Sequence, residues 1–423
     1  MFAIAALLVL SIIAFFVRQR RLNDAYRTRR ASSVSAATTS ADKNAPSAQP
    51  ADHNSASPLL VSDDRDRERR AEGEHGPVLY VAPDGKDSNN GSRKRPFATI
   101  DKAALAASPG TTVIVLPGTY SGPIKTKVSG TESARIRYES EEKWAAKLRT
   151  NDATRTGVHW DNSGSYVDIV GFDMSGADSY GIYNRGSHVA ILNNHIHDYT
   201  QVSCKDGGAG IEHGVYDGRY TSTDNDTVGN VVHNIRPPSD CNAPHGSGIY
   251  HAVKGGRILN NVVYNNGKNG IQLWHAATDV IIANNTTFKN HWDGIMVGNE
   301  GMCCGSSTGR VDNTMVVNNI SFANERDGIH EYGQVGPSNT YSNNLVYHNG
   351  DIDLHLINRA AAKDTIKEDP QFVRYDPASG DGDYRVKASS PARGRCTKMA
   401  APAHDVEGKL RFQGGNCTIG AYE

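Results

Sequence analysis

Short apolar runs alternate with polar corners along the chain between residues 165 and 360. The runs are rich in β-branched residues, as in VAIL (189–192), VII (280–282) and MVV (315–317). Glycine and asparagine follow them, and the apolar positions do not recur every 3.6 residues as they would in an amphipathic helix. The pattern therefore predicts many short β-strands joined by tight corners, where asparagine tolerates the left-handed backbone conformation.

Three markers recur in a fixed order and define a repeat. The first is an Asn-Asn pair, or Gly-Asn in one unit, whose second residue falls at Asn194, Asn230, Asn261, Asn285, Asn319 and Asn344. A ring follows three residues later, at His197, His233, Tyr264, Phe288, Phe322 and Tyr347. A Gly-Ile pair lies between these groups, at Ile182, Ile211, Ile249, Ile271, Ile295 and Ile329. The shortest unit, Asn261 to Asn285, spans 24 residues, which fits three short strands in one coil of a solenoid.

Stacked coils of this kind place equivalent residues above one another, about 4.8 Å apart. We expect each asparagine amide to bond to the same asparagine one coil away, and the rings to stack inside or beside the core. FATIDKAALAAS (97–108) has a helix-forming composition, with Gly110 shortly after it. Such a helix would cover the open first coil, which otherwise exposes core and strand edge. The predicted fold is all-β, a single-stranded right-handed parallel β-helix with a short N-terminal capping helix.

Both ends of this region carry further signals. The opening VLYVAPDGKDSNNGSRKRPFATIDKAALAASPGTTVIVLPGTYSG (78–122) contains a strand, a Gly/Asn turn, the helix, a strand and a Pro-Gly-Thr-Tyr turn. The closing part contains DYRVKASSPARGRC (383–396) and DVEGKLRFQGGNCTIGAYE (405–423). With the repeat, these segments resemble the pectin-lyase-like superfamily of right-handed parallel β-helix proteins, over roughly residues 78–423. The resemblance implies a polysaccharide-lyase-like N-terminal cap; these motifs specify a fold better than a function.

The composition divides the chain into three parts. We predict an N-terminal hydrophobic signal or anchor segment (1–21), a disordered linker (22–76) and a β-helix domain (77–423), with repeats at about 165–360 and a C-terminal cap at 361–423. The linker is rich in Ala, Ser, Thr, Pro and charge, and buries too little apolar surface to offset the entropy of ordering.

The N-terminal segment bears on localisation. Residues 2–17 are apolar except for Ser11 and are followed by Arg18, Arg20 and Arg21. No basic residues precede them and no clear cleavage site follows, which favours a signal anchor over a cleaved signal peptide. Arginines after the segment favour a cytoplasmic C-terminal side, whereas the cysteines and the β-helix favour an extracytoplasmic domain. We predict an extracytoplasmic protein, secreted or held at the membrane through residues 2–17, and a monomer.

The net charge and the spacing of the cysteines limit the kinds of partner that this chain is expected to bind. The formal net charge is −1, so no strong basic field argues for nucleic acid. The six cysteines show no zinc-finger spacing, and the even number fits either disulfides or buried thiols. A disulfide between Cys396 and Cys417 is slightly favoured over two unpaired cysteines. The adjacent cysteines of GMCCG (301–305) have two alternatives: a vicinal disulfide with each other, or bonds to separate partners such as Cys204 and Cys241.

Enlarged loops point to the functional face. They flank the Gly-Ile strands at 195–209, 212–227, 231–247 and 296–313, so we expect them to wall a groove, and the resemblance implies a polysaccharide lying along it. Alternation turns the residue after each isoleucine outward. The predicted outward rows are Tyr183, Glu212, Tyr250, Gln272, Met296 and His330, then Arg185, Gly214, Ala252, Trp274, Gly298 and Tyr332. Flat rings and polar groups are the mixture that sugars bind.

A polysaccharide lyase is the preferred function. It needs a cation to neutralise a uronate carboxylate, a base for the C5 proton and an acid for the leaving oxygen. The predicted catalytic residues are Lys254 or His251 as base, Arg219 as cation, Tyr250 as acid, and His213. The predicted substrate-binding residues are Arg185, Glu212, Gln272, Trp274, His275, His330 and Tyr332, of which Arg185 and Tyr332 are second candidates for cation and acid. We interpret His197 and His233 as members of the ring column, and His195, His348 and His355 as surface residues.

The sequence also leaves open a metal cofactor and functions other than that of a lyase. Ca²⁺ is a candidate cofactor, with Asp206, Asp217, Glu212 and Glu300 as hard oxygen ligands, but no metal site is predicted because none of them forms a recognised calcium loop. A glycosidase needs two carboxylates, offered by Glu212, Glu331, Asp293 and Asp327; the last two precede Gly-Ile and are expected to cap turns. The motifs of polygalacturonase-like hydrolases and of mannuronan epimerases are absent. A non-catalytic polysaccharide-binding or cell-envelope scaffold is the second hypothesis, and an adhesin-like surface protein is the third.

Overall fold

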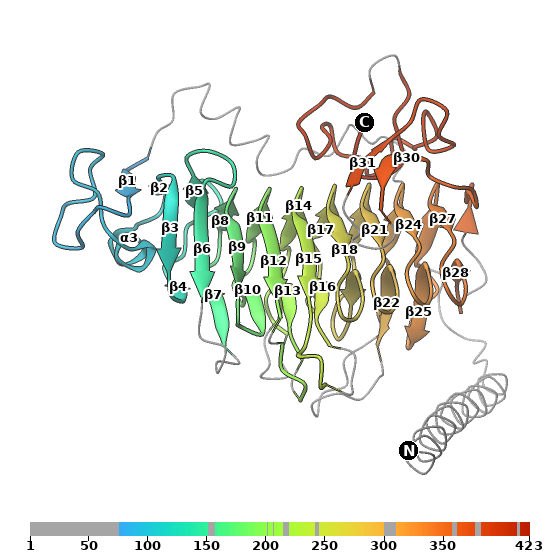
Figure 1. Ribbon diagram of the computed structural model, residues 1–423, viewed down its shortest axis with the longest axis horizontal. Helices are drawn as coiled ribbons and strands as arrows, with labels where there is room; N and C mark the ends of the chain where they lie inside the picture. Colours follow the sequence, from blue (N-terminus) through green and yellow to red (C-terminus); the bar gives the residue numbers. More distant parts are fainter. Residues whose placement is uncertain are drawn as a thin grey trace, which may run out of the picture. The chain divides into compact units, whose positions relative to one another are not determined.

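The computed structural model describes residues 76–150, 157–200, 202–205, 207–214, 220–241, 245–299, 310–357, 362–376, 382–412 and 415–423. These residues form a parallel β-helix, in which a typical coil contributes one strand to each of three sheets (Figure 1). The fold class predicted from the repeat is therefore confirmed. The repeat begins well before residue 165, because the coils already start within the N-terminal region.

Among the described residues, the first sheet has eleven strands, in the order β1 (Val78–Val81), β2 (Thr112–Val115), β5 (Ile136–Ser140), β8 (Val167–Val170), β11 (Ala190–Leu192), β14 (Asp226–Val228), β17 (Arg257–Leu259), β20 (Ile281–Ala283), β23 (Met315–Val317), β26 (Thr340–Ser342) and β29 (Ala362–Lys363). The second has nine: β3 (Gly118–Ser121), β6 (Ala146–Thr150), β9 (Asp173–Gly176), β12 (His195–Tyr199), β15 (Val231–Ile235), β18 (Val262–Tyr264), β21 (Thr286–Phe288), β24 (Ile320–Phe322) and β27 (Leu345–Tyr347). The third also has nine: β4 (Ile124–Thr126), β7 (Val158–Asn162), β10 (Tyr180–Asn184), β13 (Ala209–His213), β16 (Ser247–His251), β19 (Ile271–Leu273), β22 (Ile295–Asn299), β25 (Ile329–Gly333) and β28 (Leu354–His355).

The Gly-Ile isoleucines fill the interior of the stack. Parallel pairing sets Ile249 beside Ile271 and Ile271 beside Ile295, and each of these three is fully buried. The small residue before the isoleucine is required by the corner, since a Cβ on Gly270 would lie 2.6 Å from the carbonyl oxygen of Gly294. Core and corner together explain why Gly-Ile recurs as a pair.

The asparagine pairs occupy the corner between the first and second sheets, and their two members have different roles. The first member turns the chain, with φ of 56° at Asn260 and 55° at Asn284. The second points inward: Asn285 donates from Nδ2 to Oδ1 of Asn319 at 2.9 Å and accepts from Nδ2 of Asn261 at 2.9 Å. The same bond joins the successive residues Asn194, Asn230, Asn261, Asn285, Asn319 and Asn344. The predicted amide ladder is confirmed.

The N-terminal helix is shorter than the predicted segment. α3 (Ile100–Ala106) begins after Thr99, whose hydroxyl accepts a hydrogen bond from the backbone N–H of Lys102 at 3.1 Å. Its apolar side, with Ile100, Ala103 and Ala104 buried, packs against β1, β2 and β4 at the first coils. The helix lies at the blue end of the stack in Figure 1, as expected of a cap.

The ring column lies on the outer side of the second sheet. His233 and Tyr264 stack with ring centroids 4.6 Å apart, and Tyr264 and Phe288 stack at 4.7 Å. The hairpin of β30 (Phe372–Tyr375) and β31 (Gly382–Val386) covers part of this column, with Tyr384 4.4 Å from Phe288. The rings therefore stack beside the main core rather than inside it.

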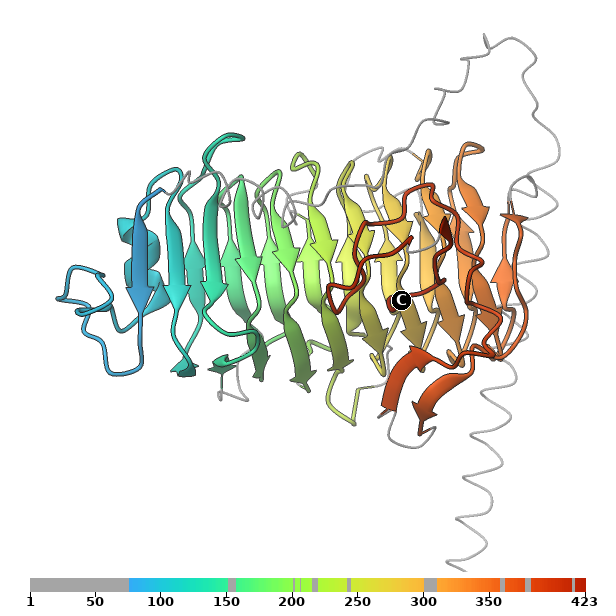
Figure 2. The same ribbon diagram turned by 90° about the horizontal axis from the view of Figure 1, so that it is seen from above.

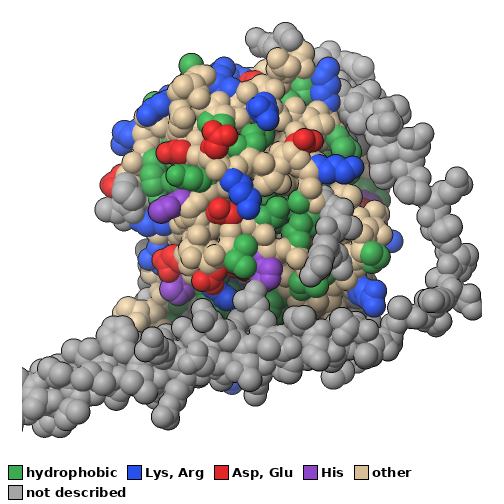
Figure 3. Space-filling model, turned by 90° about the vertical axis from the view of Figure 1, so that its right-hand side faces the viewer, with side chains coloured by type: hydrophobic (Ala, Val, Ile, Leu, Met, Phe, Trp, Pro, Cys, Tyr) green, Lys and Arg blue, Asp and Glu red, His purple; other side chains and the backbone are tan. Residues whose placement is uncertain are grey.

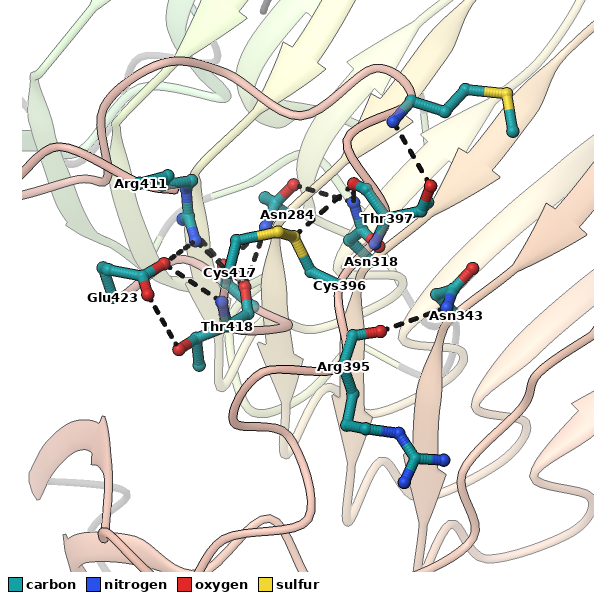
Figure 4. The surroundings of a disulfide bond; sticks show 12 residues. Asn284, Asn318, Asn343, Arg395, Cys396, Thr397, Arg411, Cys417, Thr418 and Glu423 are labelled. Atoms are coloured by element: carbon teal, nitrogen blue, oxygen red, sulfur yellow. Dashed lines mark hydrogen bonds and ion pairs between the residues drawn. A yellow bond between two sulfur atoms is a disulfide. The ribbon is translucent and has the colours of Figure 1, made fainter. Parts of the chain in front are cut away.

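The C-terminal segment runs along the side of the stack. Asn318 binds Thr397 in both directions, with Nδ2 to the carbonyl at 2.8 Å and Oδ1 accepting from the N–H at 2.9 Å. Asn284 donates to the carbonyls of Thr418 and Gly420, and Asn343 donates to that of Arg395 (Figure 4). Figure 2 shows this red segment lying across the yellow and orange coils. The corner asparagines that turn each coil thus also hold the end of the chain.

Two disulfides are present among the described residues. Cys396 bonds to Cys417 within the C-terminal segment, as predicted (Figure 4). Cys204 bonds to Cys241, with Cα atoms 5.6 Å apart. The suggested pairing of these two with the cysteines of GMCCG is therefore corrected. The loops that carry Cys204 and Cys241 leave neighbouring strands, β12 and β15, one coil apart, which brings these two cysteines together.

Several predictions concern residues outside the described ranges. These include the anchor at 2–17, the linker up to residue 75, and the adjacent cysteines of GMCCG. Within the described part of the chain, no helix combines the length and hydropathy needed to cross a bilayer.

The end of the stack at β27 and β28, viewed in Figure 3, shows hydrophobic side chains among charged ones of both signs.

Replacing a rung of the amide ladder should destabilise the fold. Asn285→Ala removes the donors to the carbonyl of Ile258 (2.8 Å) and to Asn319, and leaves the backbone N–H of Asn261 without its acceptor (2.9 Å) in a fully buried corner. We expect a loss of about 3–5 kcal/mol in the free energy of unfolding, measured by urea denaturation. The control Asn90→Ala, on an exposed turn, should cost under about 1 kcal/mol. Equal losses would contradict a special role for the ladder.

Candidate functional site

The outer face of the third sheet carries one continuous row of polar and aromatic side chains. In-register pairing aligns Tyr183 with Glu212, Glu212 with Tyr250, and Tyr250 with Gln272. The row continues through Met296 and His330. The outward row predicted from alternation is thus present in the strand register.

Glu212 is the second member of this row, between Tyr183 and Tyr250. Its side chain is buried, at 7% exposure, and no hydrogen bond or ion pair engages its carboxyl among the described residues. Desolvation by burial raises the pKa of Glu212 to about 8. The carboxyl is therefore protonated at neutral pH and can donate a hydrogen bond between Tyr183 and Tyr250.

His275 follows β19 at the edge of the same face. Its ring stacks on Tyr220, with centroids 4.3 Å apart, and meets Tyr250 edge-on at 6.3 Å. Its backbone has φ of 54°, the left-handed region that a histidine rarely adopts. Burial lowers the pKa of His275 to about 4, so the ring is neutral at pH 7, and its Nδ1 has no hydrogen-bond partner within the described part of the protein.

A small apolar cluster supports these rings. Tyr220, Ala252 and Val253 are buried together, with Tyr250 and Ala276 packed against them. Tyr220 comes from the loop at 212–227, whose length predicted a wall beside this face, but nothing in the sequence singled out this residue. Only the fold brings Tyr220 onto His275, two coils along the stack.

Trp274 and Tyr332 form a second aromatic surface on the same face. Their rings are nearly parallel, with centroids 5.8 Å apart and an interplanar angle of 22°. Both residues are partly exposed, so the flat faces are available to a ligand. Tyr332 also meets His330 edge-on at 5.7 Å, which links this surface to the outward row.

Gln272 and His330 are fixed by hydrogen bonds to corner residues. Gln272 Oε1 accepts from Ser247 Oγ at 2.9 Å and from Asn269 Nδ2 at 3.0 Å. His330 Nδ1 donates to Asp293 Oδ2 at 2.9 Å. The two residues therefore line the face but have part of their hydrogen-bonding capacity already used.

The two basic residues predicted here are both in ion pairs. Arg185 Nη2 lies 2.5 Å from Asp161 Oδ1. Lys254 Nζ lies 3.3 Å from Asp279 Oδ2, with 62% of its side chain exposed. Both are at the margin of the face, while Arg219 lies outside the described residues.

His213 and His251 do not belong to the outer face. They lie two residues after an inward isoleucine, and alternation continues through them into the interior, where both are fully buried. His213 contacts Asn184 Nδ2 at 3.0 Å and Thr227 Oγ1 at 2.8 Å, and His251 Nε2 donates to the carbonyl of Gly255 at 2.8 Å. A polysaccharide cannot reach them there, so they leave the candidate catalytic set.

The carboxylates considered for hydrolysis are mostly engaged. Glu331 is fully buried and accepts from Tyr341 Oη at 2.9 Å and from the N–H of Ile357 at 2.8 Å. Asp293 and Asp327 cap corners as predicted, because Asp293 Oδ1 accepts from the N–H of Asp327 at 3.2 Å. Of these four carboxylates, Glu212 alone has no such partner among the residues that the structure describes.

Asp327, His330 and His355 are close enough to hold a metal ion. His355 Nδ1 donates to Asp327 Oδ2 at 3.0 Å, and the rings of His330 and His355 stack at 4.6 Å. Burial alone would raise the pKa of Asp327, but the hydrogen bond from His355 and the nearby His330 lower it overall. The mixed nitrogen and oxygen donors do not suit Ca²⁺, which prefers oxygen. Three of the ligands proposed for Ca²⁺, Asp206, Asp217 and Glu300, lie outside the described residues.

The groove expected from the enlarged loops stays a prediction. The four enlarged loops expected to wall it each include residues outside the described ranges, at 201, 206, 215–219, 242–244 and 300–309. The described residues do contain the floor: one row on the third sheet with aromatic surfaces at two places, and the uncharged carboxyl of Glu212 one strand before Tyr250.

Comparison with known proteins places this architecture among its relatives. The model of a family described as Pel9A-like, right handed beta helix region, matches residues 79–367. An uncharacterized protein, YwoF, of Bacillus subtilis (strain 168) is 32% identical over 148 residues, and pectate lyase L of Dickeya chrysanthemi is 27% identical over 146 residues. The alignments cover 31% of this chain and only 31% and 34% of those proteins, about a third of their length.

Solved structures extend the likeness at the level of the fold. Pectate lyase Pel9A superimposes with a TM-score of 0.59 at 18% identity, covering 83% of this chain and 97% of that one. A rhamnogalacturonan lyase superimposes with a TM-score of 0.55 at 17% identity, covering 74% and 96%. At these identities the likeness establishes a shared β-helix.

The protonated Glu212 carboxyl should make stability depend on pH. Because its folded pKa of about 8 lies above the ordinary value of 4.5, stability is full below about 4.5 and falls as pH rises through 8. Glu212→Gln cannot ionise, so it should match the parent at about pH 4 and exceed its free energy of unfolding by up to about 5 kcal/mol at about pH 9. Urea denaturation at both values measures this. The exposed control Glu142→Gln should show no such difference, and an unchanged pH slope in Glu212→Gln would refute the assignment.

Proposed function

The chain belongs to the Pel9A-like right-handed β-helix family, and from this premise we propose that it is a carbohydrate-active protein that binds an acidic polysaccharide along the outer face of the third sheet. The stacked pair Trp274–Tyr332 carries the proposal, because partly exposed flat rings are suited to the apolar faces of sugar rings. From β10 to β25 the face spans five strand spacings, about 24 Å. That length accommodates several sugar residues.

The finer proposal is a lyase that cleaves a uronate-containing polymer by β-elimination. Its support is the similarity to pectate lyase L over a third of that protein, together with a neutral imidazole and a phenol on one face. His275, neutral at pH 7, takes the C5 proton, and Tyr250, whose ring lies 6.3 Å away, supplies a proton to the leaving oxygen. Removal of the C5 proton and loss of the glycosidic oxygen leave a double bond between C4 and C5.

The cations bind the uronate carboxylates. Lys254 was the first candidate for the base, but its ammonium is ion-paired with Asp279, 3.3 Å away. Lys254 and Arg185, which follow β16 and β10 at the same edge of the third sheet, are therefore assigned to carboxylate binding. The protonated Glu212 donates a hydrogen bond to the same acidic substrate, whereas an ionised Glu212 would repel it.

A non-catalytic polysaccharide-binding or scaffold protein is the second candidate. The observation that favours it is the low exposure of the groups that would do chemistry: Glu212 and His275 are each 7% exposed. Such a protein would keep the Trp274–Tyr332 surface and have no turnover. A two-carboxylate hydrolase is not proposed, since Glu331, Asp293 and Asp327 hold internal hydrogen bonds.

The cellular setting follows from the disulfides. Cys204–Cys241 and Cys396–Cys417 are typical of an oxidising compartment, outside the cytosol. We propose an extracytoplasmic protein, a monomer, with the β-helix domain at 77–423 tethered through the linker at 22–76 and a membrane anchor at 2–17.

Turnover by the full chain tests the lyase proposal. On a panel of uronate polymers such as pectate, rhamnogalacturonan and alginate, we expect ultraviolet absorbance from unsaturated uronides. His275→Gln and Tyr250→Phe should each lower kcat about 100-fold or more, with binding retained. The control Tyr347→Phe removes a hydroxyl from the second sheet and should leave kcat unchanged. Binding without turnover by the unaltered chain would select the scaffold instead.

Binding tests the broader proposal separately. Trp274→Ala should weaken affinity for the best-bound polymer about 3- to 10-fold, because one stacking surface is lost. Affinity electrophoresis measures this without requiring turnover. Trp292→Ala, on a tryptophan that faces Arg326 and Lys268 away from this row, is the matched control. Equal effects of the two substitutions would argue against the Trp274–Tyr332 surface as the binding platform.

A further inference from the structure

Three histidines meet on the outer side of the second sheet, away from the face described above. His195 and His197 are two residues apart on β12, so they point to the same side. Parallel pairing sets His197 beside His233 of β15. The cluster therefore joins two successive coils, between Asp173 on one side and the ring of Tyr264 on the other.

The ring nitrogens converge. His195 Nε2 lies 2.9 Å from His233 Nε2, and one potential ligand atom from each of the three histidines lies within 4.8 Å of the others. The rings are close to parallel, with His195 and His197 stacked at 4.1 Å and His197 and His233 at 5.4 Å. Zn²⁺ binds imidazole nitrogen at about 2.0–2.1 Å, so small rotations of these side chains would close the nitrogens around one ion.

Carboxylates hold the opposite nitrogen of two of the rings. His195 Nδ1 donates to Asp173 Oδ2 at 2.8 Å, and His197 Nδ1 donates to Asp198 Oδ2 at 2.8 Å. Each carboxylate is held in turn, Asp198 by Asn234 Nδ2 at 2.7 Å and Asp173 by Arg149. A carboxylate on one nitrogen fixes the tautomer that leaves the other nitrogen as a ligand, and this is the usual outer partner of metal-binding histidines.

We propose that His195, His197 and His233 bind a Zn²⁺ ion through their Nε2 atoms, with water in the fourth position. Three imidazoles suit Zn²⁺ and its transition-metal neighbours rather than Ca²⁺ or Mg²⁺. The side chains of His195 and His197 are 22% and 15% exposed, so solvent reaches the site. Binding releases two protons to solvent, the one shared between His195 and His233 and the one on His197 Nε2, which turns from Asp173, 3.2 Å away, to the metal.

The second histidine cluster differs from the first in which ring nitrogens converge. In the group of Asp327, His330 and His355, the convergent nitrogens are the Nδ1 atoms, and both already donate to Asp293 or Asp327. In the first cluster the Nε2 atoms of His195 and His233 face each other, and carboxylates hold the Nδ1 atoms of His195 and His197. The ring column predicted from sequence accounts for His197 and His233 as stacked rings, but not for this arrangement of carboxylates.

Metal titration of the full chain tests the site. After treatment with a chelator, Zn²⁺ added in a calorimeter should bind with one equivalent that is lost in His195→Gln and in His233→Gln. Asp198→Asn keeps all three ligands and should weaken this equivalent about 10- to 100-fold. His291→Gln, an exposed histidine paired with Glu325, should leave it unchanged, as should His355→Gln. Circular dichroism of the metal-free variants checks that each is folded.

Trp144 provides a local reporter. Its ring lies 4.9 Å from that of His195, so Cu²⁺ in the site should quench its fluorescence. Trp144→Phe should remove most of the quenching and keep the bound equivalent. Zn²⁺ binding that survives in folded His195→Gln and His233→Gln, or that disappears only in His355→Gln, would overturn the proposal. Neither result depends on polysaccharide binding or turnover.

Discussion

The buried amide ladder is the interaction on which the rest of the structure depends. Parallel in-register coils repeat one position directly above itself, so any polar group buried in one coil must find its partner in the next. The second asparagine of each pair does this: its amide bonds to its counterpart and to backbone groups of adjacent coils, as Asn285 does with Ile258 and Asn261. Because the corner is satisfied internally, the coils can stack closely and present long rows of side chains on their outer faces.

Those rows explain why candidate sites occur on two faces of one solenoid. Along the third sheet, register lines up Tyr183, Glu212 and Tyr250, and the Glu212 carboxyl has no partner among the described residues, so that its burial keeps it protonated. Along the second sheet, the same register lines up His197 with His233 and places Asp173 one coil away from His195. In-register stacking of the coils therefore places chemically similar groups next to one another. Such proximity destabilises buried like charges, but it favours shared protons, stacked rings or the binding of a metal ion.

The boundary between structural and functional residues follows side-chain direction. His213 and His251 have the chemistry of catalytic residues, yet alternation sends them into the interior, where Asn184 and Gly255 use their nitrogens. Glu331 is likewise committed to Tyr341. Gln272 and Tyr250 are one residue away from inward positions and lie on the outer row. A shift of a single residue thus separates a core histidine from a candidate proton donor.

The sequence by itself determined the repeat, the fold class, the capping helix, the amide ladder, the outward row and the Cys396–Cys417 bond, because these features recur at fixed spacing or lie close together along the chain. It also assigned Trp274, His275 and Tyr250 to one face. Tertiary structure decided what spacing cannot express. The stacking of Tyr220 on His275, the pairing of Cys204 with Cys241, the path of the C-terminal segment along Asn284 and Asn318, and the convergence of His195 with His233 all join residues from different coils. Their distances are set by how loops of unequal length return to the common frame, and no local pattern encodes that return.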